Sequence, residues 1–212
     1  MAHYDLEEQE QIDTLKTWWK MYGNLVTGVL FAASLAVVGW QGWSWYKNGQ
    51  ASQAAGVYAV LEQAVAAGDA QKVKSAAGEL VEKFGGTHYA ALGAMLAAKQ
   101  SFDAGDLKTA KSQLAWVAEN GKDELRDMAR LRLAAVQLDE KAYDEALKYL
   151  DATHAKAFDG RFEELKGDIL TAQGKKAEAR AAYKAALEKS GEKKSASHEL
   201  LQQKLDDLGE AA

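Results

Sequence analysis

Residues 127–152 read DMARLRLAAVQLDEKAYDEALKYLDA, and their pattern predicts two helices joined by a tight turn at Lys141. Small residues stand at Ala134 in the first helix and at Ala146 in the second, where paired helices approach each other most closely. Leu150 continues the apolar face of the second helix. The stretch therefore predicts a helix pair that is one copy of a repeat.

Three other segments align with this one when their turns are superimposed. The four turn residues, at offsets of 37, 36 and 33 residues, are Gly68, Gly105, Lys141 and Gly174. A period in the thirties predicts a helical solenoid. In the last three copies the small residues are Ala98, Ala134 and Gly167 in the first helices, and Ala110, Ala146 and Ala179 in the second helices. The first copy is degenerate, because Leu61 and Val73 replace its small residues.

This pattern is the tetratricopeptide pattern, in which each helix pair buries a face against its neighbours. The chain has no proline, which favours long helices joined by glycine and polar turns. The final SHELLQQKLDDLG, residues 197–209, predicts a C-terminal capping helix with Ser197 as its N-cap. The fold class is therefore predicted as all-α, with about four helix pairs and a cap. An irregular bundle of alanine-rich helices is the alternative.

A second feature is the uncharged stretch GNLVTGVLFAASLAVVGWQGWSWY, residues 23–46. As a helix it would be about 36 Å long, enough to cross a lipid bilayer whose hydrocarbon core is about 30 Å thick. Aromatic residues gather at both of its ends, namely Trp18, Trp19 and Tyr22, then Trp40, Trp43, Trp45 and Tyr46. The stretch predicts a single uncleaved transmembrane helix. A cleaved signal peptide and a buried core helix are the alternatives, but a signal peptide would have a basic leader and a shorter apolar run.

The charges around this helix predict its orientation. Lys16 and Lys20 precede it and only Lys47 follows closely, so the excess of lysine favours a cytoplasmic N-terminus. In a bacterium the C-terminal domain would then be periplasmic. We predict four parts: an acidic cytoplasmic tail over residues 1–22, the membrane helix over 23–46, a short flexible linker over 47–54, and a repeat domain over 55–212.

Small residues recur along the predicted membrane helix. Gly28, Ala32 and Ala36 follow one another at intervals of four residues, so they share one face of the helix. Such a face allows another membrane helix to approach closely. The alternative is that it simply faces lipid.

The composition excludes several kinds of chemistry. The chain has no cysteine, so it has no disulfide, thiolate nucleophile or lipid-modified cysteine. The formal net charge is −5, which argues against nucleic acid as a partner. The histidines His3, His88, His154 and His198 lack the convergent spacing of metal ligands. We therefore expect no catalytic residue, no cofactor and no metal, and the chain is not predicted to be an enzyme.

The first helices of a tetratricopeptide array line its concave face. The predicted lining residues of the second, third and fourth copies are Leu92, Met95, Lys99 and Phe102, then Met128, Leu131, Ala135 and Leu138, then Arg161, Glu164, Asp168 and Thr171. Apolar residues dominate the first two sets, which suits an apolar helix or peptide from another protein. The alternative is that the repeats themselves bury these side chains.

The chain resembles the YfgM family of bacterial inner-membrane proteins, which are ancillary subunits of the SecYEG translocon. The resemblance covers nearly the whole chain and rests on EEQEQIDTLKTWWKMYGN at residues 7–24, the single apolar helix, MARLRLAAVQL at 128–138 and LKGDILTAQG at 165–174. It implies a periplasmic repeat domain that binds a membrane-anchored periplasmic chaperone of the PpiD type near the translocon. It also implies that this domain helps to pass exported proteins to chaperones.

Two functions follow as hypotheses. The first is an adaptor at the translocon, with the anchor in the lipid bilayer and the repeat groove holding a chaperone. The second is a membrane-bound regulator that binds a cytoplasmic protein through its acidic tail. Arg130 and Arg132 are candidates to pair either with acidic groups of a partner or with Asp127 or Glu163 of the same chain.

Overall fold

The computed structural model describes residues 6–190 and 195–209, and within these ranges the chain is helical, without a strand. The helices are α1 (Leu6–Ala66), α2 (Ala70–Phe84), α3 (His88–Asp103), α4 (Leu107–Asn120), α5 (Asp123–Asp139), α6 (Tyr143–Leu150), α7 (Asp159–Ala172), α8 (Lys176–Lys189) and α9 (Ala196–Asp207), with a 3₁₀ turn η1 (Lys156–Phe158) before α7. The predicted all-α class is confirmed. The first five residues of the acidic tail, with His3 and Asp5, lie outside the described ranges.

The chain divides into two compact units between Gln50 and Ala51. Helix α1 has residues in both units, and residues 47–54, predicted as a flexible linker, are helical throughout. The prediction of an irregular joint is therefore not matched by the structure. Glycine lowers helix stability by only about 1 kcal/mol, so Gly49 does not end the helix, and fully buried Ala54 already packs in the repeat core.

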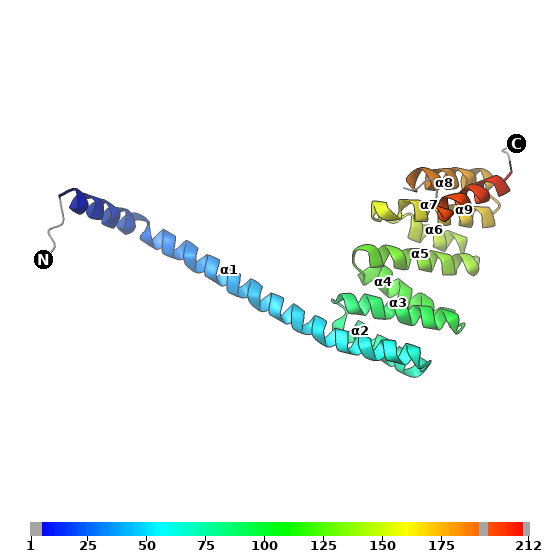
Figure 1. The fold of residues 1–212 in the computed structure, drawn as a ribbon, viewed down its shortest axis with the longest axis horizontal. Coiled ribbons are helices and arrows are strands. Elements are labelled where there is room, and N and C mark those ends of the chain that lie inside the picture. Colours follow the sequence, from blue (N-terminus) through cyan, green and yellow to red (C-terminus); the bar gives the residue numbers. More distant parts are fainter. Residues whose placement is uncertain (1–5, 191–194, 210–212) are drawn as a thin grey trace. The chain divides into compact units, whose positions relative to one another are not determined.

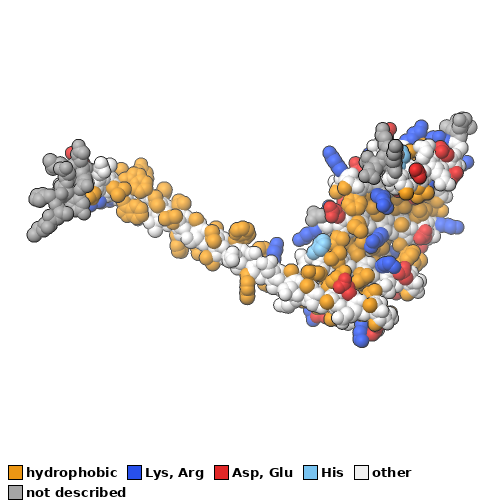
Figure 2. Space-filling model, viewed as in Figure 1, with side chains coloured by type: hydrophobic (Ala, Val, Ile, Leu, Met, Phe, Trp, Pro, Cys, Tyr) orange, Lys and Arg blue, Asp and Glu red, His pale blue; other side chains and the backbone are white. Residues whose placement is uncertain are grey.

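The N-terminal unit contains the helix that the sequence predicts to cross a membrane. Helix α1 is long and apolar enough for this role, and only 6% of its most apolar stretch is buried. A core helix of a soluble protein would bury most of such a stretch. Hydrophobic side chains cover this part of α1 (Figure 2), and the exposed residues include Val29, Leu30 and Phe31.

In the second unit the helices stack pair upon pair (Figure 1). Residues 51–66 of α1 act as the first helix of the first pair, because Ala54, Leu61 and Ala64 are buried together with Val73, Ala77 and Leu80 of α2. Leu61 occupies a position where the other copies have a small residue. Gly93 of α3 makes room for it, since a Cβ there would lie 3.2 Å from Leu61 Cδ2 and 2.4 Å from Leu80 Cδ1.

The turns within the pairs confirm the predicted repeat alignment. Gly68, Gly105, Lys141 and Gly174 have φ values of 68°, 80°, 61° and 76°, so all four adopt the left-handed conformation. The equivalent backbone hydrogen bonds also recur, as in Gly105 N–H to Phe102 O and Lys141 N–H to Leu138 O, both 2.9 Å. Lysine is uncommon at positive φ. Lys141 therefore shows that the turn geometry is kept even where glycine is absent.

The predicted small residues lie where the helices meet. Ala110, Ala134, Ala146 and Ala179 have no exposed surface, and Ala98 is 2% exposed. At Gly167 of α7 an added Cβ would lie 2.4 Å from Cε1 of Tyr183 in α8, so no side chain fits there without a shift. The small residues therefore set the distance between paired helices, as the repeat pattern predicts.

Helix α9 packs at the end of the stack, as the sequence predicts for a capping helix. Leu201, Leu205 and Leu208 are buried against a cluster that includes Leu170 and Tyr183. The prediction of its N-cap is wrong. Ser195, not Ser197, has the extended backbone of an N-cap, and its side chain accepts a hydrogen bond from His198 N–H at 3.3 Å. Ser197 lies inside the first turn.

Candidate functional site

An apolar groove lies on the repeat unit between the first helices of the second and third pairs. Helix α3 contributes Met95, Ala98, Lys99 and Phe102, helix α4 contributes Leu114, and helix α5 contributes Arg132, Ala135, Val136 and Asp139. The groove has a volume of about 300 Å³. Met95 and Ala98 form part of a buried floor, whereas the Phe102 ring at its edge is 42% exposed. This arrangement offers an open apolar surface on the stack.

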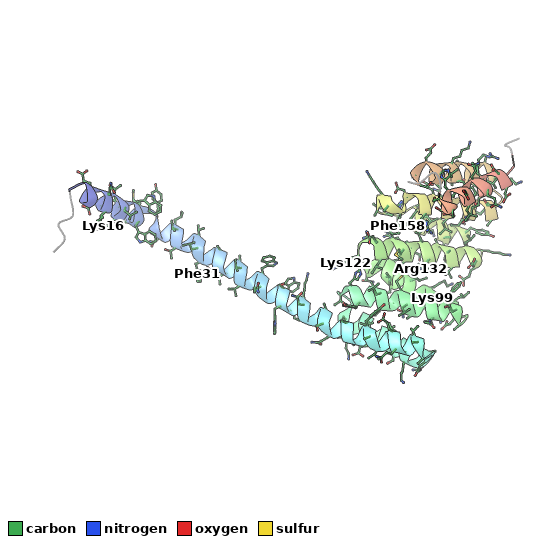
Figure 3. The ribbon with its side chains drawn as sticks, viewed as in Figure 1. Lys16, Phe31, Lys99, Lys122, Arg132 and Phe158 are labelled. Carbon is green, nitrogen blue, oxygen red and sulfur yellow. The ribbon has the colours of Figure 1, made fainter. Side chains whose placement is uncertain are left out.

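Charged side chains stand at the rim of this groove. Lys99 forms an ion pair with Asp103 one turn further along α3. Arg132 and Asp139 of α5 are both exposed, and neither has a side-chain partner within residues 6–190 and 195–209. Figure 3 labels Lys99 on α3 and Arg132 on α5, in neighbouring layers of the stack. The rim therefore carries one ion pair formed within α3 and two unpaired charges that a bound partner could neutralise.

The predicted groove residues divide into two sets. Met95, Lys99, Phe102 and Ala135 line the groove together. Met128, Leu131 and Leu138 are half-buried and pack against core clusters of the repeats, and half-buried Leu92 does not line the groove. For Leu131 and Leu138 the packing partners include Phe162 and Ile169 of α7. Where α5 meets α7, the repeats therefore bury their own concave residues, as the alternative interpretation expects.

The predicted lining residues do not include Ala98, Leu114, Val136 or Asp139, and Arg132 is predicted only as a pairing residue. The spacing of the lining residues on α5 could have indicated part of this set. Arg132, Ala135, Val136 and Asp139 follow at intervals of three, one and three residues, which places them on one helical face. Leu114 comes from the second helix of its pair, so a rule based on first helices could not include it.

In the last pair three of the four predicted concave residues, Glu164, Asp168 and Thr171, contact other side chains of the chain, whereas Arg161 is exposed. Lys204 of α9 donates hydrogen bonds to Glu164 Oε1 at 2.9 Å and to the two Asp168 carboxylate oxygens at 2.8 and 2.9 Å. The Tyr183 hydroxyl donates to Asp168 Oδ1 at 2.7 Å and lies 3.2 Å from Thr171 Oγ1. We call Glu164, Asp168, Tyr183 and Lys204 the α9 clasp. Its contacts close this end of the concave face.

Burial and charge perturb two groups of the α9 clasp. Burial, with the nearby Asp168 carboxylate adding to it, raises the pKa of Tyr183 to about 12. Burial alone would lower the pKa of Lys204, but the hydrogen bonds and charges of Asp168 and Glu164 outweigh it and raise that pKa above its usual value. The lysine is therefore held as a cation and the tyrosine as a neutral phenol. That combination suits a structural contact.

A buried carboxylate also holds the loop between α6 and α7. Asp127 of α5 is 1% exposed and accepts hydrogen bonds from Ala155 N–H at 2.9 Å and from Arg130 Nη1 at 3.4 Å. Arg130 also donates to Thr153 O at 2.8 Å. The predicted pairing of Arg130 with Asp127 is confirmed. For Arg132 the structure shows neither of the predicted intramolecular pairs.

The small-residue face of the predicted membrane helix is exposed. Gly28, Ala32 and Ala36 all lie on the surface of α1, and a Cβ added to Gly28 would meet no heavy atom within 4 Å. This geometry fits both a lipid-facing surface and a surface for another membrane helix.

Comparison with known proteins agrees with this architecture. A family model for a tetratricopeptide repeat-like domain matches residues 16–210. The fold and this match define the chain as a tetratricopeptide repeat-like protein, and its described residues include one candidate membrane-spanning helix.

Curated relatives match the chain over nearly its whole length. It is 37% identical to a Neisseria gonorrhoeae protein over 96% of this chain and 98% of the relative. It is 30% identical to a Haemophilus influenzae protein over 86% of this chain and 90% of the relative, and 29% identical to an Escherichia coli protein over 95% and 96%. All three are named ancillary SecYEG translocon subunits. The chain belongs to this family.

Proposed function

We propose that this protein is a membrane-anchored adaptor that associates with the SecYEG translocon and links exported proteins to a periplasmic chaperone. The observation that carries the proposal is the open apolar groove between α3 and α5, in a chain whose relatives are named as translocon subunits. The lining of the groove is mostly apolar, as in a surface that binds another protein. A binding role accounts for the groove directly.

The anchor would be α1, crossing the inner membrane once with its N-terminus in the cytoplasm. The exposed apolar surface of α1 needs a lipid or protein environment, because large contiguous apolar surfaces are rare on soluble proteins. The two lysines before the apolar stretch support a cytoplasmic N-terminus. The repeat unit and its groove would then lie in the periplasm.

The partner of the groove would be a membrane-anchored chaperone of the PpiD type, as the family resemblance implies. The apolar floor supports a protein partner, since such surfaces bind apolar helices and peptides of other proteins. The exposed face with Gly28, Ala32 and Ala36 offers a contact for a translocon subunit within the bilayer.

Site-specific photocrosslinking in intact cells tests this assignment. A photoreactive residue is placed at Phe102 or Ala135 in the groove, at Ala32 in α1, at Gln11 in the tail, and at exposed Ser112 of α4 as a control outside the groove. The adaptor predicts chaperone adducts from Phe102 and Ala135 and translocon adducts from Ala32, with neither from Ser112. If only Gln11 captured a protein, the regulator that acts through its tail would replace the adaptor.

A further inference from the structure

The two unpaired charges of the groove have opposite signs and a fixed spacing. Arg132 and Asp139 lie seven residues apart on α5, which is two helical turns and a rise of about 10.5 Å. Both side chains are exposed and lack a partner in the part of the chain that the structure describes. The remaining rim lysine, Lys99, is neutralised by Asp103. The groove therefore has a positive end and a negative end.

The surface between these two ends is apolar. Ala135 and Val136 lie between Arg132 and Asp139 along α5, and Met95, Ala98 and Phe102 of α3 line the facing side. An occupant that covers this floor also reduces the access of water to both charges, which makes their pairing with opposite charges more favourable. Apolar burial would supply affinity, and the two charges would select the sequence and direction of the occupant.

The groove walls restrict the backbone conformation of that occupant. The lining residues all come from helices, whose main-chain N–H and C=O groups are already bonded within those helices. An extended segment would find no strand edge on this wall, so its main-chain groups would have to stay hydrogen-bonded to water while its side chains cover the floor. A helix satisfies its main chain internally and can present an apolar face to the floor.

Building on the proposed function, we propose that the groove recognises an amphipathic helix of the partner protein by both its apolar face and its charge order. The helix places an acidic side chain against Arg132 and a basic side chain, seven residues away, against Asp139. The same two-turn spacing on both helices lets the two pairs form together. The groove thereby fixes the direction in which the partner helix lies.

Three synthetic helical peptides test this inference. They share one apolar face and differ only at two positions seven residues apart, which carry Glu and Lys, Glu and Glu, or Lys and Lys. Binding is measured by fluorescence anisotropy to the full chain in phosphatidylcholine nanodiscs at low salt, with empty nanodiscs subtracted. Because exposed ion pairs contribute modestly, the Glu/Lys peptide is expected to bind wild type about two- to fivefold more tightly than the other two.

Charge reversal should change this order of affinities. Arg132→Glu gives the groove two negative ends, so the Lys/Lys peptide should become the tightest of the three. Asp139→Lys gives it two positive ends, so the Glu/Glu peptide should become the tightest. Lys122→Glu is the matched control, because Lys122 is exposed and lies outside the groove, and it should leave the wild-type order unchanged.

A groove-filling variant separates this inference from the proposed function. Ala135→Trp should bind none of the three peptides, although its circular dichroism spectrum should show that it is folded like wild type. If Ala135→Trp blocks binding but Arg132→Glu and Asp139→Lys leave the order of affinities unchanged, the charge selection is wrong and the groove still binds an apolar helix. If no peptide binds, or if light scattering shows a dimer that Ala135→Trp dissociates, both the charge selection and the partner-binding role of the groove are overturned.

Discussion

Gly167 of α7 has no room for a side chain beside Tyr183 of α8. Its backbone lies against the ring of Tyr183, which is held in place by the hydrogen bond from its hydroxyl to Asp168. The ring is 3% exposed and has little room to move aside. Glycine at this position therefore allows the fourth pair to pack around a large aromatic side chain.

Gly167→Ala should destabilise the repeat unit. The added Cβ would lie 2.4 Å from Cε1 and 2.5 Å from Cδ1 of Tyr183, so α7 and α8 must separate or the ring must leave its site. Overpacking of this kind costs about 1–3 kcal/mol. Denaturation of the full chain in detergent, followed by circular dichroism, measures the change in the free energy of unfolding.

Gly78→Ala is the matched control for that experiment. Gly78 lies inside α2, and a Cβ there would meet no heavy atom within 4 Å. Because alanine favours helix more than glycine does, we expect this variant to be more stable than wild type by about 0.5–1 kcal/mol. Equal stability of Gly167→Ala and wild type would contradict the close-contact explanation.

At the scale of elements, helix α9 is held by apolar packing and by the α9 clasp. Lys204 is the one cation in this clasp, and its side chain is 27% exposed. Lys204→Met keeps the apolar stem but leaves Glu164 without its cation and Asp168 with only the Tyr183 hydroxyl. Loss of hydrogen bonds between charged groups is worth about 1–3 kcal/mol. We expect a lower melting temperature by circular dichroism, whereas Lys184→Met on the exposed face of α8 should leave it unchanged.

The α9 clasp also predicts how stability depends on pH. The pKa of Tyr183 is raised to about 12 by burial and Asp168, so the neutral phenol is favoured in the folded state. An unfolded tyrosine has a pKa of about 10, so this contribution is complete below pH about 10 and is lost as the pH rises toward about 12. The raised pKa of Lys204 acts in the same direction.

Melting temperatures of the full chain between pH 8 and pH 12 test this expectation. Wild type should lose stability above pH about 10 more steeply than Tyr183→Phe, because phenylalanine has no proton to lose. Tyr183→Phe starts from a lower melting temperature, since it lacks the hydrogen bond to Asp168. Parallel curves for the two proteins would show that Tyr183 does not contribute to the alkaline transition.

Much of the element order could be predicted from the sequence because the repeat specifies local geometry. A turn residue with positive φ and small residues at two fixed positions are local requirements, and Lys141, Ala134 and Ala146 meet them where predicted. Residues 47–54 are helical although their glycine-containing polar sequence favours a flexible linker by local propensity. There the surrounding helix and the burial of Ala54 prevail over local propensity.

The candidate groove was harder to predict, because it depends on which concave residues neighbouring pairs cover. Leu131 and Leu138 have the same apolar character as Met95, yet they pack against a cluster that contains Phe162 and Ile169. Likewise, Asp168 has the sequence position of an open concave residue, but Lys204 reaches it from α9. Such covering comes from contacts distant in sequence, which the repeat period alone does not encode.

At the scale of the whole molecule, the order of the tail, the apolar helix and the repeat unit predicts a defined membrane topology. The chain has no cysteine, so a single one can be introduced at Gln11 in the tail or at exposed Ser112 in the repeat unit. In cells with a permeabilised outer membrane, a membrane-impermeant maleimide should label Ser112→Cys. It should label Gln11→Cys only after the inner membrane is lysed. The reverse pattern would place the repeat unit in the cytoplasm.

The proposed adaptor joins the translocon through α1 and a chaperone through the α3–α5 groove. It is tested most directly by purifying the full chain from cells in mild detergent, as wild type and as Ala135→Trp, and quantifying the bound translocon and PpiD-type chaperone by mass spectrometry. Ser112→Trp controls for an added indole outside the groove. We expect Ala135→Trp to retain the translocon and lose the chaperone, while wild type and Ser112→Trp retain both. Retention of the chaperone by folded Ala135→Trp at the wild-type level would contradict it.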